Sequence, residues 1–375
     1  MRIAVNTRLL LKGKLEGIGW YIHETLKRMV KAHPEHQFFF FFDRPFDNQF
    51  VFAENVQPVV LGPQARHPFL YLAWFEWSVA NALRKYKIDV FLSPDNFSSL
   101  RTKVPTCLVI HDLAFEHYPQ YIGRLDRWHY RKYVPKFALK ANRIVAVSEF
   151  TKKDIIERYH VAQDKIDVIY NGAHEAYKPI AYEEKLAVRN KYTEGRQYFL
   201  YTGSLHPRKN VINLLKAFVK FKRRQRSPMK LVIVGRMAWM ADDIKEAKEK
   251  MPFKEEVIWL GYQDIDELSK ITAAAYALVY PSLFEGFGIP ILEALKSGVP
   301  VITSNTSSMP EVVGDAGLLV EPGDVESIAA ALERMYKDEN GRAAFIKAAE
   351  IQAQKFSWDI SAQALYASLM KCVNQ

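Results

Sequence analysis

Residues 276–298 read YALVYPSLFEGFGIPILEALKSG, and this stretch decides the fold. The apolar run 276–280 is typical of a buried strand, and Pro281 ends it. Pro290 suits the first turn of a helix, where its missing N–H group costs nothing, and Gly298 stops that helix. The stretch therefore predicts a strand, a glycine-rich turn and a helix, the unit that parallel α/β sheets repeat.

Two carboxylates flank the predicted turn. Glu285 follows the strand, and Glu293 lies eight positions later, one turn inside the helix. The N–H groups of Gly288 and Ile289 lie between them at a helix N-terminus, where they can bind an anion. Two glutamates at this spacing are more often plain surface residues, but the surrounding strand, turn and helix favour a functional site. The arrangement suits a polyhydroxylated ligand that carries phosphate.

A second motif, TGSLHPRKN, occupies residues 202–210 after an apolar strand pattern. Gly203 permits a tight turn, and Asn210 can cap the helix that follows. Arg208 and Lys209 supply two positive charges beside that helix N-terminus, which makes a good diphosphate site. An Arg-Lys pair is often only a solvated surface, but its place at the end of a parallel strand favours binding. We expect both side chains to face solvent at the loop end.

The composition is that of a globular protein with two domains. The chain has 375 residues, of which 49% are hydrophobic and 25% are charged. No apolar stretch reaches the roughly 20 residues that a membrane-spanning helix needs, and the first residues read as a short strand rather than a signal peptide. Cys107 and Cys372 are far apart in sequence and have apolar neighbours, so we expect a reduced, cytoplasmic setting.

The net charge of +10 is concentrated in the first half. Residues 1–170 contain 25 Lys and Arg against 17 Asp and Glu, whereas residues 171–375 contain 27 against 25. This excess suggests an anionic partner such as a membrane surface, a lipid phosphate or a nucleic acid, although a merely solvated basic surface explains it equally well. Aromatic and basic residues alternate over 118–133, which fits either membrane contact or a helix that packs its aromatic side. No nucleic-acid motif accompanies the charge, so we expect no nucleic-acid partner.

Strand and helix patterns alternate in two series, which predicts two doubly wound, Rossmann-like α/β domains whose strand ends face a central cleft. We place the first domain at 1–170, a charged interdomain connection at 171–196, the second domain at 197–357, and at 358–375 a C-terminal helix that packs back on the first domain. The expected strands are 3–5, 38–42, 59–61, 90–92, 107–110, 144–147, 199–202, 231–234, 257–260, 278–280 and 301–302. The expected helices are 20–31, 69–86, 127–140, 151–159, 211–222, 244–249, 265–275 and 291–296, with a helical tail over 325–373.

With these motifs in hand, the chain resembles the retaining nucleotide-sugar glycosyltransferases of the GT-B fold, specifically glycosyltransferase family 4. The matching segments of the second half are GSLHPRKN at 203–210, VIVGR at 232–236, GYQDIDEL at 261–268, the stretch 281–302 and MPEVVGDAG at 309–317. The first half adds GIG at 17–19, IHD at 110–112, VSEFT at 147–151 and NG at 171–172. The first domain, which matches less closely, would bind the acceptor.

The resemblance implies how the donor nucleotide would be bound. Arg208 and Lys209 would hold its diphosphate, and Glu293 would accept hydrogen bonds from its ribose hydroxyls. Many relatives carry an arginine where this chain has Ser204, so the phosphate charge would rest on Arg208 and Lys209. No Asp-x-Asp of the kind that holds a metal on a nucleotide-sugar in the other major glycosyltransferase fold is apparent. We therefore expect no metal and no cofactor.

The resemblance also implies which residues act on the sugar. His111 and Glu285 would be the catalytic residues: Glu285 would hold the transferred sugar, and His111 would point toward the sugar and the acceptor. Further donor contacts would come from the backbone of Phe287, Gly288 and Ile289 and from a loop at Gly17 and Gly19. Same-face attack through an oxocarbenium-like state is the mechanism favoured for the family, and Glu285 reads as a sugar ligand rather than a nucleophile.

The reaction implied is transfer of a hexose, with retention, from GDP-mannose or a UDP-sugar to a glycan or a lipid-linked glycan acceptor, as in polysaccharide and lipopolysaccharide biosynthesis. The sequence of segment 281–317 resembles that of mannosyltransferases that use GDP-mannose, although enzymes that use UDP-sugars have similar sequences there. The setting would be cytoplasmic, and the basic first half leaves open a peripheral place at the inner membrane face.

Two alternatives compete with this interpretation. Gly17-Ile18-Gly19 begins like the dinucleotide motif of an NAD-dependent oxidoreductase, and Asp43 stands where a ribose-binding acid would lie. However, Ile22 replaces the third glycine, and the motif begins eleven residues after Asn6 rather than directly after the strand. The other alternative is a non-catalytic sugar-binding or membrane-docked partner on the same scaffold, because a fold does not fix a function. The intact motif residues argue against it.

Overall fold

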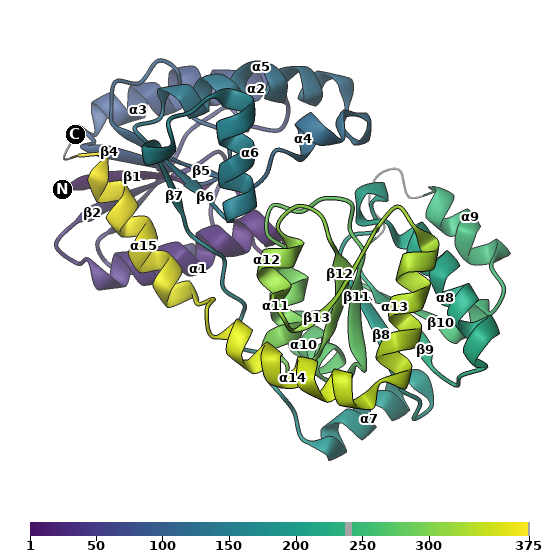
Figure 1. Cartoon of the computed structure of the whole chain (residues 1–375). Coiled ribbons are helices and arrows are strands. Elements are labelled where there is room, and N and C mark those ends of the chain that lie inside the picture. The colour runs from purple at the N-terminus through teal and green to yellow at the C-terminus, as the bar shows by residue number, and fades with distance from the viewer. Residues whose placement is uncertain (237–241, 374–375) are drawn as a thin grey trace. The chain divides into compact units, whose positions relative to one another are not determined.

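The structure is a computed structural model that describes residues 1–236 and 242–373. The chain forms two compact units (Figure 1). Unit 1 comprises Met1–Asn171 together with Ser357–Gln375, and unit 2 comprises Gly172–Phe356. Each unit is a parallel sheet covered by helices, which confirms the predicted α/β class.

Unit 1 contains a seven-stranded sheet in the order β3-β2-β1-β4-β5-β6-β7. Its strands are β1 (Arg2–Asn6), β2 (Gln37–Phe42), β3 (Val56–Val60), β4 (Val90–Ser93), β5 (Thr106–Ile110), β6 (Arg143–Ala146) and β7 (Ile166–Val168). Its helices are α1 (Gly17–Ala32), α2 (Pro68–Ala73), the π-helical turn η2 (Trp74–Val79), α3 (Ala80–Lys85), α4 (Ala114–His117), α5 (Arg124–Lys140), α6 (Glu149–Tyr159) and α15 (Trp358–Lys371). Short 3-10 turns lie at Asn48–Phe50, Pro119–Tyr121 and Gln163–Lys165.

Unit 2 contains a six-stranded parallel sheet in the order β10-β9-β8-β11-β12-β13. Its strands are β8 (Tyr198–Thr202), β9 (Lys230–Val234), β10 (Val257–Gly261), β11 (Ala277–Tyr280), β12 (Val301–Ser304) and β13 (Gly317–Val320). Its helices are α7 (Tyr182–Thr193), α8 (Val211–Gln225), α9 (Asp242–Lys250), α10 (Ile265–Ala274), α11 (Ile289–Lys296), α12 (Met309–Val313), α13 (Val325–Lys337) and α14 (Glu339–Ala353), with 3-10 turns at Pro207–Lys209 and Lys254–Glu256.

The phenylalanine run in β2 explains how unit 1 forms its core. β2 pairs with β1 on one side and β3 on the other, and Phe38–Phe42 are each at most 3% exposed. A strand that helices cover on both faces must be apolar at every position rather than at alternate ones. The five phenylalanines therefore belong to the core of unit 1, and the expected strand at 38–42 is confirmed.

Strand order reverses once in each sheet, and these reversals locate the sites where ligands bind to such folds. The reversal falls between β1 and β4 in unit 1 and between β8 and β11 in unit 2. Ligands of doubly wound sheets bind outside the carboxyl ends of the strands at such a switch point. Of the two motifs found in the sequence, 202–210 begins at the last residue of β8 and 281–290 directly follows β11.

Several elements differ from the sequence prediction. Strands β7 and β13 and helices α7 and α12 were not predicted, because each is short or only weakly periodic. Helix α7 lies in the stretch 171–196 that reads as a connection, so this stretch is folded and belongs largely to unit 2. The expected helix 69–86 contains the π turn η2, and α1 begins at Gly17 rather than at residue 20.

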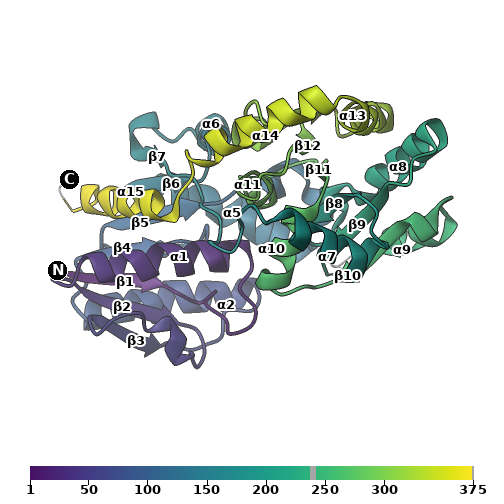
Figure 2. The ribbon, with the colours of Figure 1, turned by 90° about the horizontal axis from the view of Figure 1, so that it is seen from below.

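The C-terminal helix α15 packs within unit 1, beside α1 (Figure 2). The rings of Trp358 and Tyr21 meet edge to face with centroids 6.0 Å apart, and Arg28 Nε donates to Asp359 Oδ1 at 2.7 Å. The Ser361 hydroxyl donates to the carbonyl oxygen of Tyr170. No helix among residues 1–236 and 242–373 has the length and apolar character needed to cross a membrane.

Candidate active site

Two glycines shape the loop that follows β8. Gly203 has φ +136° and Gly235 has φ +155°, a backbone region that favours glycine. A Cβ atom on Gly235 would lie 1.8 Å from the carbonyl oxygen of Gly203, so the two backbones touch and a side chain at residue 235 cannot fit. The glycine of the VIVGR motif thus lets the β8 loop pack against the end of β9.

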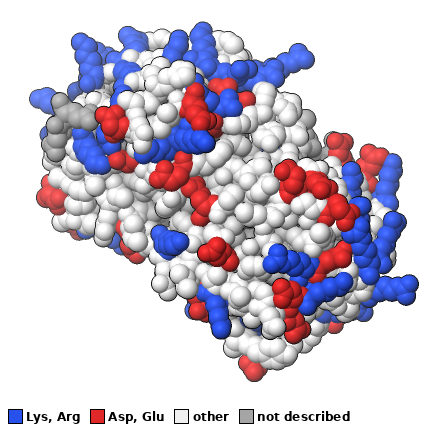
Figure 3. All heavy atoms as spheres, viewed as in Figure 1, with Lys and Arg blue, Asp and Glu red and all other residues white. Residues whose placement is uncertain are grey.

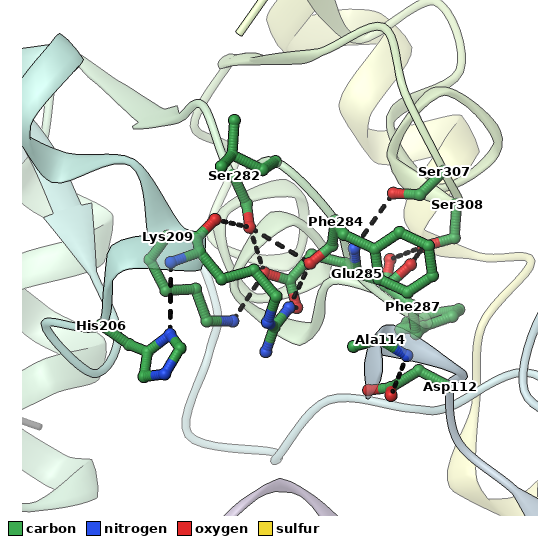
Figure 4. Close-up of polar contacts among 12 residues, drawn as sticks. Asp112, Ala114, His206, Lys209, Ser282, Phe284, Glu285, Phe287, Ser307 and Ser308 are labelled. Carbon is green, nitrogen blue, oxygen red and sulfur yellow. Dashed lines mark hydrogen bonds and ion pairs between the residues drawn. The ribbon is translucent and has the colours of Figure 1, made fainter. Parts of the chain in front are cut away.

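Glu285 is the centre of the candidate site (Figure 4). Its side chain lies after β11, and the residue is only 7% exposed. Lys209 Nζ lies 2.6 Å from Glu285 Oε1, and Arg208 Nη1 lies 3.4 Å from Oε2. The hydroxyls of Ser282 and Tyr280 donate to Oε1 at 2.6 and 3.0 Å. The structure therefore brings together three residues that the sequence singled out from two separate motifs.

The charge of Glu285 follows from these contacts. Burial by itself raises the pKa of a carboxyl group, but the positive charges of Lys209 and Arg208 and the hydrogen bonds from Lys209 and Ser282 outweigh it and lower the pKa of Glu285 to about 2. Glu285 is therefore ionised at neutral pH. Two cations and one buried carboxylate therefore meet at the ends of β8 and β11.

The expectation that Arg208 and Lys209 face solvent is wrong. Their side chains are only 19% and 13% exposed. Arg208 Nη1 also donates to the carbonyl oxygen of Phe284, and Lys209 Nζ donates to the Tyr280 hydroxyl at 2.7 Å. The sequence shows two charges at a loop end. It does not show that buried acceptors at the end of the neighbouring strand β11 bind these side chains and so keep them from solvent.

Serines that the sequence analysis passed over hold the backbone of the glycine-rich turn. Ser307 accepts from the N–H of Glu285 at 3.0 Å. Ser308 donates to the carbonyl oxygens of Glu285 and Phe287, at 2.9 and 3.0 Å. Both serines lie in the NTSSMP segment just before α12, and hydroxyl residues clustered next to a matched motif are the signal that could have identified them.

Helix α11 begins at Ile289, directly after the glycine-rich turn. Gly288 precedes the helix with φ +99°, and a Cβ there would lie 3.0 Å from Ile291 Cδ1. Ile289 and Pro290 form the first turn of α11. Gly288 is the N-cap residue, and it has no side chain that could cap the helix. The ring of Phe287 is buried and packs edge to face on Phe356, with centroids 5.5 Å apart. The Phe287 side chain therefore belongs to the core, and a binding role for the backbone of residues 287–289 stays a prediction.

Glu293, the second carboxylate of the motif, lies one turn inside α11 in a different environment from Glu285. Burial raises the pKa of Glu293 to about 7, against the opposing effect of a hydrogen bond from Tyr177. The two glutamates thus differ in charge near neutral pH, because one faces two cations and the other faces a tyrosine. Tyr177 is a residue that sequence reasoning missed.

His111 lies in unit 1, directly after β5. Its ring nitrogen Nε2 is 2.9 Å from the carbonyl oxygen of Pro94, so Nε2 carries the proton and Nδ1 is the basic nitrogen. Burial lowers the pKa of His111, and its ring meets that of Tyr21 edge to face at 5.0 Å. His111 is therefore a neutral imidazole with a fixed tautomer at a strand's carboxyl end.

Gly17 and Gly19 lie in the first turn of α1 rather than in a loop. Gly17 is exposed, and Glu16 before it makes no side-chain cap, so the first N–H groups of α1 can bind an anion. A Cβ on Gly19 would lie 3.1 Å from the carbonyl oxygen of Leu9, so this glycine allows the loop after β1 to pack on the helix.

A buried polar cluster at the switch point of unit 1 was missed from the sequence. Arg8 follows β1 and Asp95 follows β4, and Arg8 Nε lies 2.5 Å from Asp95 Oδ2. The guanidinium lies over the rings of Tyr71 and Phe97. Nearby, neither ring nitrogen of the buried His129 has a hydrogen-bond partner among the described residues. Polar residues placed directly after two neighbouring strands were the available signal.

Two acidic features bear on the oxidoreductase alternative and on the expectation that no metal is bound. Asp43, the acid expected in a dinucleotide site, is 2% exposed and accepts hydrogen bonds from the N–H of Ala65 and from Arg44, so it is part of the framework. The sequence does contain an Asp-x-Asp, at residues 264–266, which the sequence analysis did not single out. Asp264 caps α10 by accepting a hydrogen bond from the N–H of Glu267 at 2.9 Å. This capping role explains the presence of Asp264 at that position.

Comparison with known proteins places the chain in a family. Residues 183–352 match the family described as Glycosyl transferases group 1, and residues 15–176 match Glycosyltransferase Family 4. The O-antigen chain mannosyltransferase B of Escherichia coli is 33% identical over 361 residues, which cover 93% of this chain and 94% of that protein. The O-antigen chain mannosyltransferase RfbU of Salmonella typhimurium is 30% identical, over 72% of this chain and 71% of that protein.

Solved structures show the same fold at lower identity. WaaG, a glycosyltransferase involved in lipopolysaccharide biosynthesis, gives a TM-score of 0.77 at 17% identity and covers 97% of this chain and 99% of its own. HepE from Anabaena, in complex with UDP and glucose, gives 0.76 at 17% identity and covers 98% and 99%. Both family matches, the full-length relative and these folds agree, so the chain belongs to the family 4 glycosyltransferases of the GT-B fold.

Proposed function

We propose that this protein is a retaining, metal-independent hexosyltransferase whose donor is a nucleotide-diphosphate sugar, with GDP-mannose the first candidate. The observation that carries the proposal is the buried, ionised Glu285 held by Lys209 and Arg208 where β8 and β11 end. The O-antigen chain mannosyltransferases that match this chain favour mannose as the sugar. The complex of HepE with UDP and glucose favours a nucleotide donor in this fold.

In this proposal, Arg208 and Lys209 bind the donor diphosphate. Charge that develops on a departing nucleoside diphosphate is stabilised by preorganised cations and N–H donors. Arg208 and Lys209 provide the cations, and the N–H groups at Gly288 and Ile289 provide donors at the start of α11. The side chains of Arg208 and Lys209 are already held in place by hydrogen bonds, so little reorganisation of these cations is needed as the bond breaks.

Glu285 and Glu293 have separate roles in the proposal. Glu285 accepts hydrogen bonds from the transferred sugar and stabilises positive charge at its anomeric carbon, which suits a carboxylate with a pKa of about 2. Glu293 accepts hydrogen bonds from the ribose, and its pKa of about 7 makes this contact sensitive to pH. His111 contacts the sugar and the acceptor through Nδ1, since Nε2 is bonded to Pro94.

The acceptor is proposed to be a glycan or a lipid-linked glycan that binds unit 1. The polar cluster of Arg8, Asp95 and His129 lies at the switch point of that unit, where ligands of such sheets bind. With a lipid-linked acceptor, the protein would work at the inner membrane face and bind its anionic surface peripherally.

A donor panel tests the proposal. Thermal shift with GDP-mannose, UDP-glucose, UDP-galactose and NADH should show stabilisation by one nucleotide-sugar and none by NADH. Release of the nucleoside diphosphate in the presence of acceptor then separates an enzyme from a non-catalytic binder. Proton NMR of the product should show the anomeric configuration of the donor. An inverted product, or stabilisation by NADH alone, would contradict the proposal.

A further inference from the structure

The turn between α1 and β2 carries a cluster of metal-binding side chains outside the candidate active site. Residues 33–36 read His-Pro-Glu-His, and β2 begins at the next residue. The turn therefore lies at the amino-terminal edge of the first sheet. Gly17, Gly19 and His111 follow the carboxyl ends of strands at the opposite edge of that sheet. None of the roles proposed above uses this cluster.

Three potential ligand atoms converge in this turn. His33 Nδ1 lies 3.1 Å from Glu35 Oε1, and His36 Nε2 lies 3.6 Å from the same oxygen. The three residues together offer one ligand atom each, all within 4.8 Å of one another. Ligands about 2.1 Å from a tetrahedral zinc ion are roughly 3.4 Å apart, so small side-chain rotations suffice to close the set around an ion.

The two imidazoles are held in place by α15. The ring of Tyr366 stacks on the ring of His33, with centroids 3.5 Å apart and planes 15° from parallel. The ring of Tyr366 also stacks on that of His36, with centroids 5.9 Å apart. The Tyr366 hydroxyl lies 2.8 Å from His36 Nε2, the nitrogen that would bind the ion, so the ion replaces this hydrogen bond when it binds. The side chain of His36 is 11% exposed and that of His33 is 25% exposed, whereas Glu35 is 57% exposed and able to adjust. Stacking restrains both imidazole rings, and the exposed carboxylate can adjust, which reduces the entropic cost of binding an ion.

We propose that His33, Glu35 and His36 bind a divalent transition-metal ion of the zinc class. Two imidazoles and one carboxylate are ligands that suit Zn²⁺ and its neighbours, whereas Mg²⁺ and Ca²⁺ prefer all-oxygen sites. Solvent reaches the Glu35 side and would supply the remaining ligand. In the bound state Tyr366 remains stacked on His33, so the ion fastens the α1–β2 turn next to the C-terminal helix. The role of the ion is structural.

Zinc binding to untagged protein freed of metal by a chelator tests the proposal. Isothermal titration should give one zinc ion bound per chain, and zinc should raise Tm. Glu35→Gln and His36→Gln should each weaken binding at least about tenfold. Glu54→Gln and His67→Gln change an exposed glutamate and an exposed histidine elsewhere in unit 1 and should bind zinc like the wild type. Co²⁺ bound to the wild type should give a visible absorption band with the intensity typical of tetrahedral coordination. The two ligand variants should lack this band.

Folding and activity controls keep the result interpretable. Far-UV circular dichroism and donor binding of the Glu35→Gln variant should equal those of the wild type, because Glu35 is exposed. Zinc binding that is absent in the wild type, or unchanged in both ligand variants, would overturn the proposal and leave only hydrogen bonds between these side chains. Sugar transfer should be the same with and without zinc, so a failure of the glycosyltransferase proposal would show in a different assay.

Discussion

The ion pair between Lys209 and Glu285 joins residues from two strand ends and links stability to function. Each partner is mostly buried, so removing one leaves the other without its compensating charge. The same groups are proposed to contact the donor. Substitutions here are therefore expected to change both binding and folding, and the two effects must be measured separately.

Arg208→Ala and Lys209→Ala should each weaken donor binding by about 1.5–3 kcal/mol, since each removes a charge-assisted phosphate contact. Lys209→Ala should also lower the free energy of unfolding, because Glu285 remains buried without its nearest cation. Donor affinity by titration calorimetry and unfolding in urea separate the two effects. Lys216→Ala, at an exposed position of α8, is the matched control. Unchanged donor affinity in both Arg208→Ala and Lys209→Ala would rule out the diphosphate role.

Glu285→Gln should lower kcat more than donor affinity, because the carboxylate is proposed to act as positive charge builds on the sugar. Its folded pKa of about 2 lies below the ordinary 4.5, so its stabilising effect is present above pH 4.5 and is lost as pH falls toward 2. The variant should be less stable than the wild type at pH 7, and the difference should shrink on acidification. Steady-state kinetics and urea unfolding across this range are the measurements.

Glu293→Gln should have the opposite effect on stability. The folded pKa of about 7 lies above the ordinary 4.5, so the ionised residue costs free energy above pH 7, and this cost fades as pH falls through 7 to 4.5. The variant should gain on the order of 2 kcal/mol at pH 8 and nothing below pH 4.5. Donor affinity should fall while kcat changes little. If Glu293→Gln instead affects kcat and Glu285→Gln affects donor affinity, the two roles are reversed.

At the scale of elements, α5 combines basic and apolar side chains on its exposed side. Trp128 and Leu125 are each 43% exposed, and Phe69 of α2 lies beside Trp128 with ring centroids 6.5 Å apart. Lys and Arg side chains gather along the edge of unit 1 over α5 and α2 (Figure 3). Tyr130 and Tyr133 pack against the core of unit 1, as the helix-packing reading expects, whereas Trp128 is exposed. The pattern suits an anionic membrane surface.

Sedimentation with vesicles tests this surface. The protein should bind anionic vesicles at low salt, bind neutral ones weakly, and dissociate as ionic strength rises, since each basic residue contributes about 1 kcal/mol at the surface. Reversing the charge of Arg124, Arg131 and Lys132 should abolish binding. The same reversal at Arg84, Lys85 and Lys87, also exposed in unit 1, should leave binding intact. Arg127 of α5 is partly buried and is therefore left unchanged in this test. Protein that stays in the supernatant would direct the search to soluble glycans.

The sequence predicts long or strongly apolar elements well. The five phenylalanines of β2 and the run before Pro281 are unambiguous because complete burial demands apolar residues throughout. It fails for α7, whose buried side chains are few, and for β13, where Leu319 is 48% exposed. At the site, the sequence identifies Glu285, Arg208 and Lys209 but not their mutual pairing. Contacts such as that of Tyr177 with Glu293 join residues 116 positions apart and have no local signal.

At the scale of the whole molecule, the proposed chemistry needs no metal at the donor site. Treatment with EDTA should therefore leave transfer activity largely unchanged, because Arg208, Lys209 and the start of α11 provide the positive potential. The same treatment should lower Tm if the cluster of His33, Glu35 and His36 holds zinc. Measuring activity and Tm on one sample distinguishes the two sites. Strict dependence of donor binding on Mg²⁺ or Mn²⁺ would contradict the donor-site proposal.

The return of α15 to unit 1 has a consequence for biosynthesis. Unit 2, Gly172–Phe356, is inserted into unit 1 between Asn171 and Ser357. The ribosome therefore completes unit 2 before it makes α15. The residues of α15, which are made last, include Trp358, which contacts the ring of Tyr21, and Tyr366, which stacks on His33. During that interval the face of α1 that α15 covers is exposed on the nascent chain. Unit 1 thus begins first and is completed last. Its apolar surface on α1 stays uncovered until α15 is synthesised, more than 180 codons after Asn171.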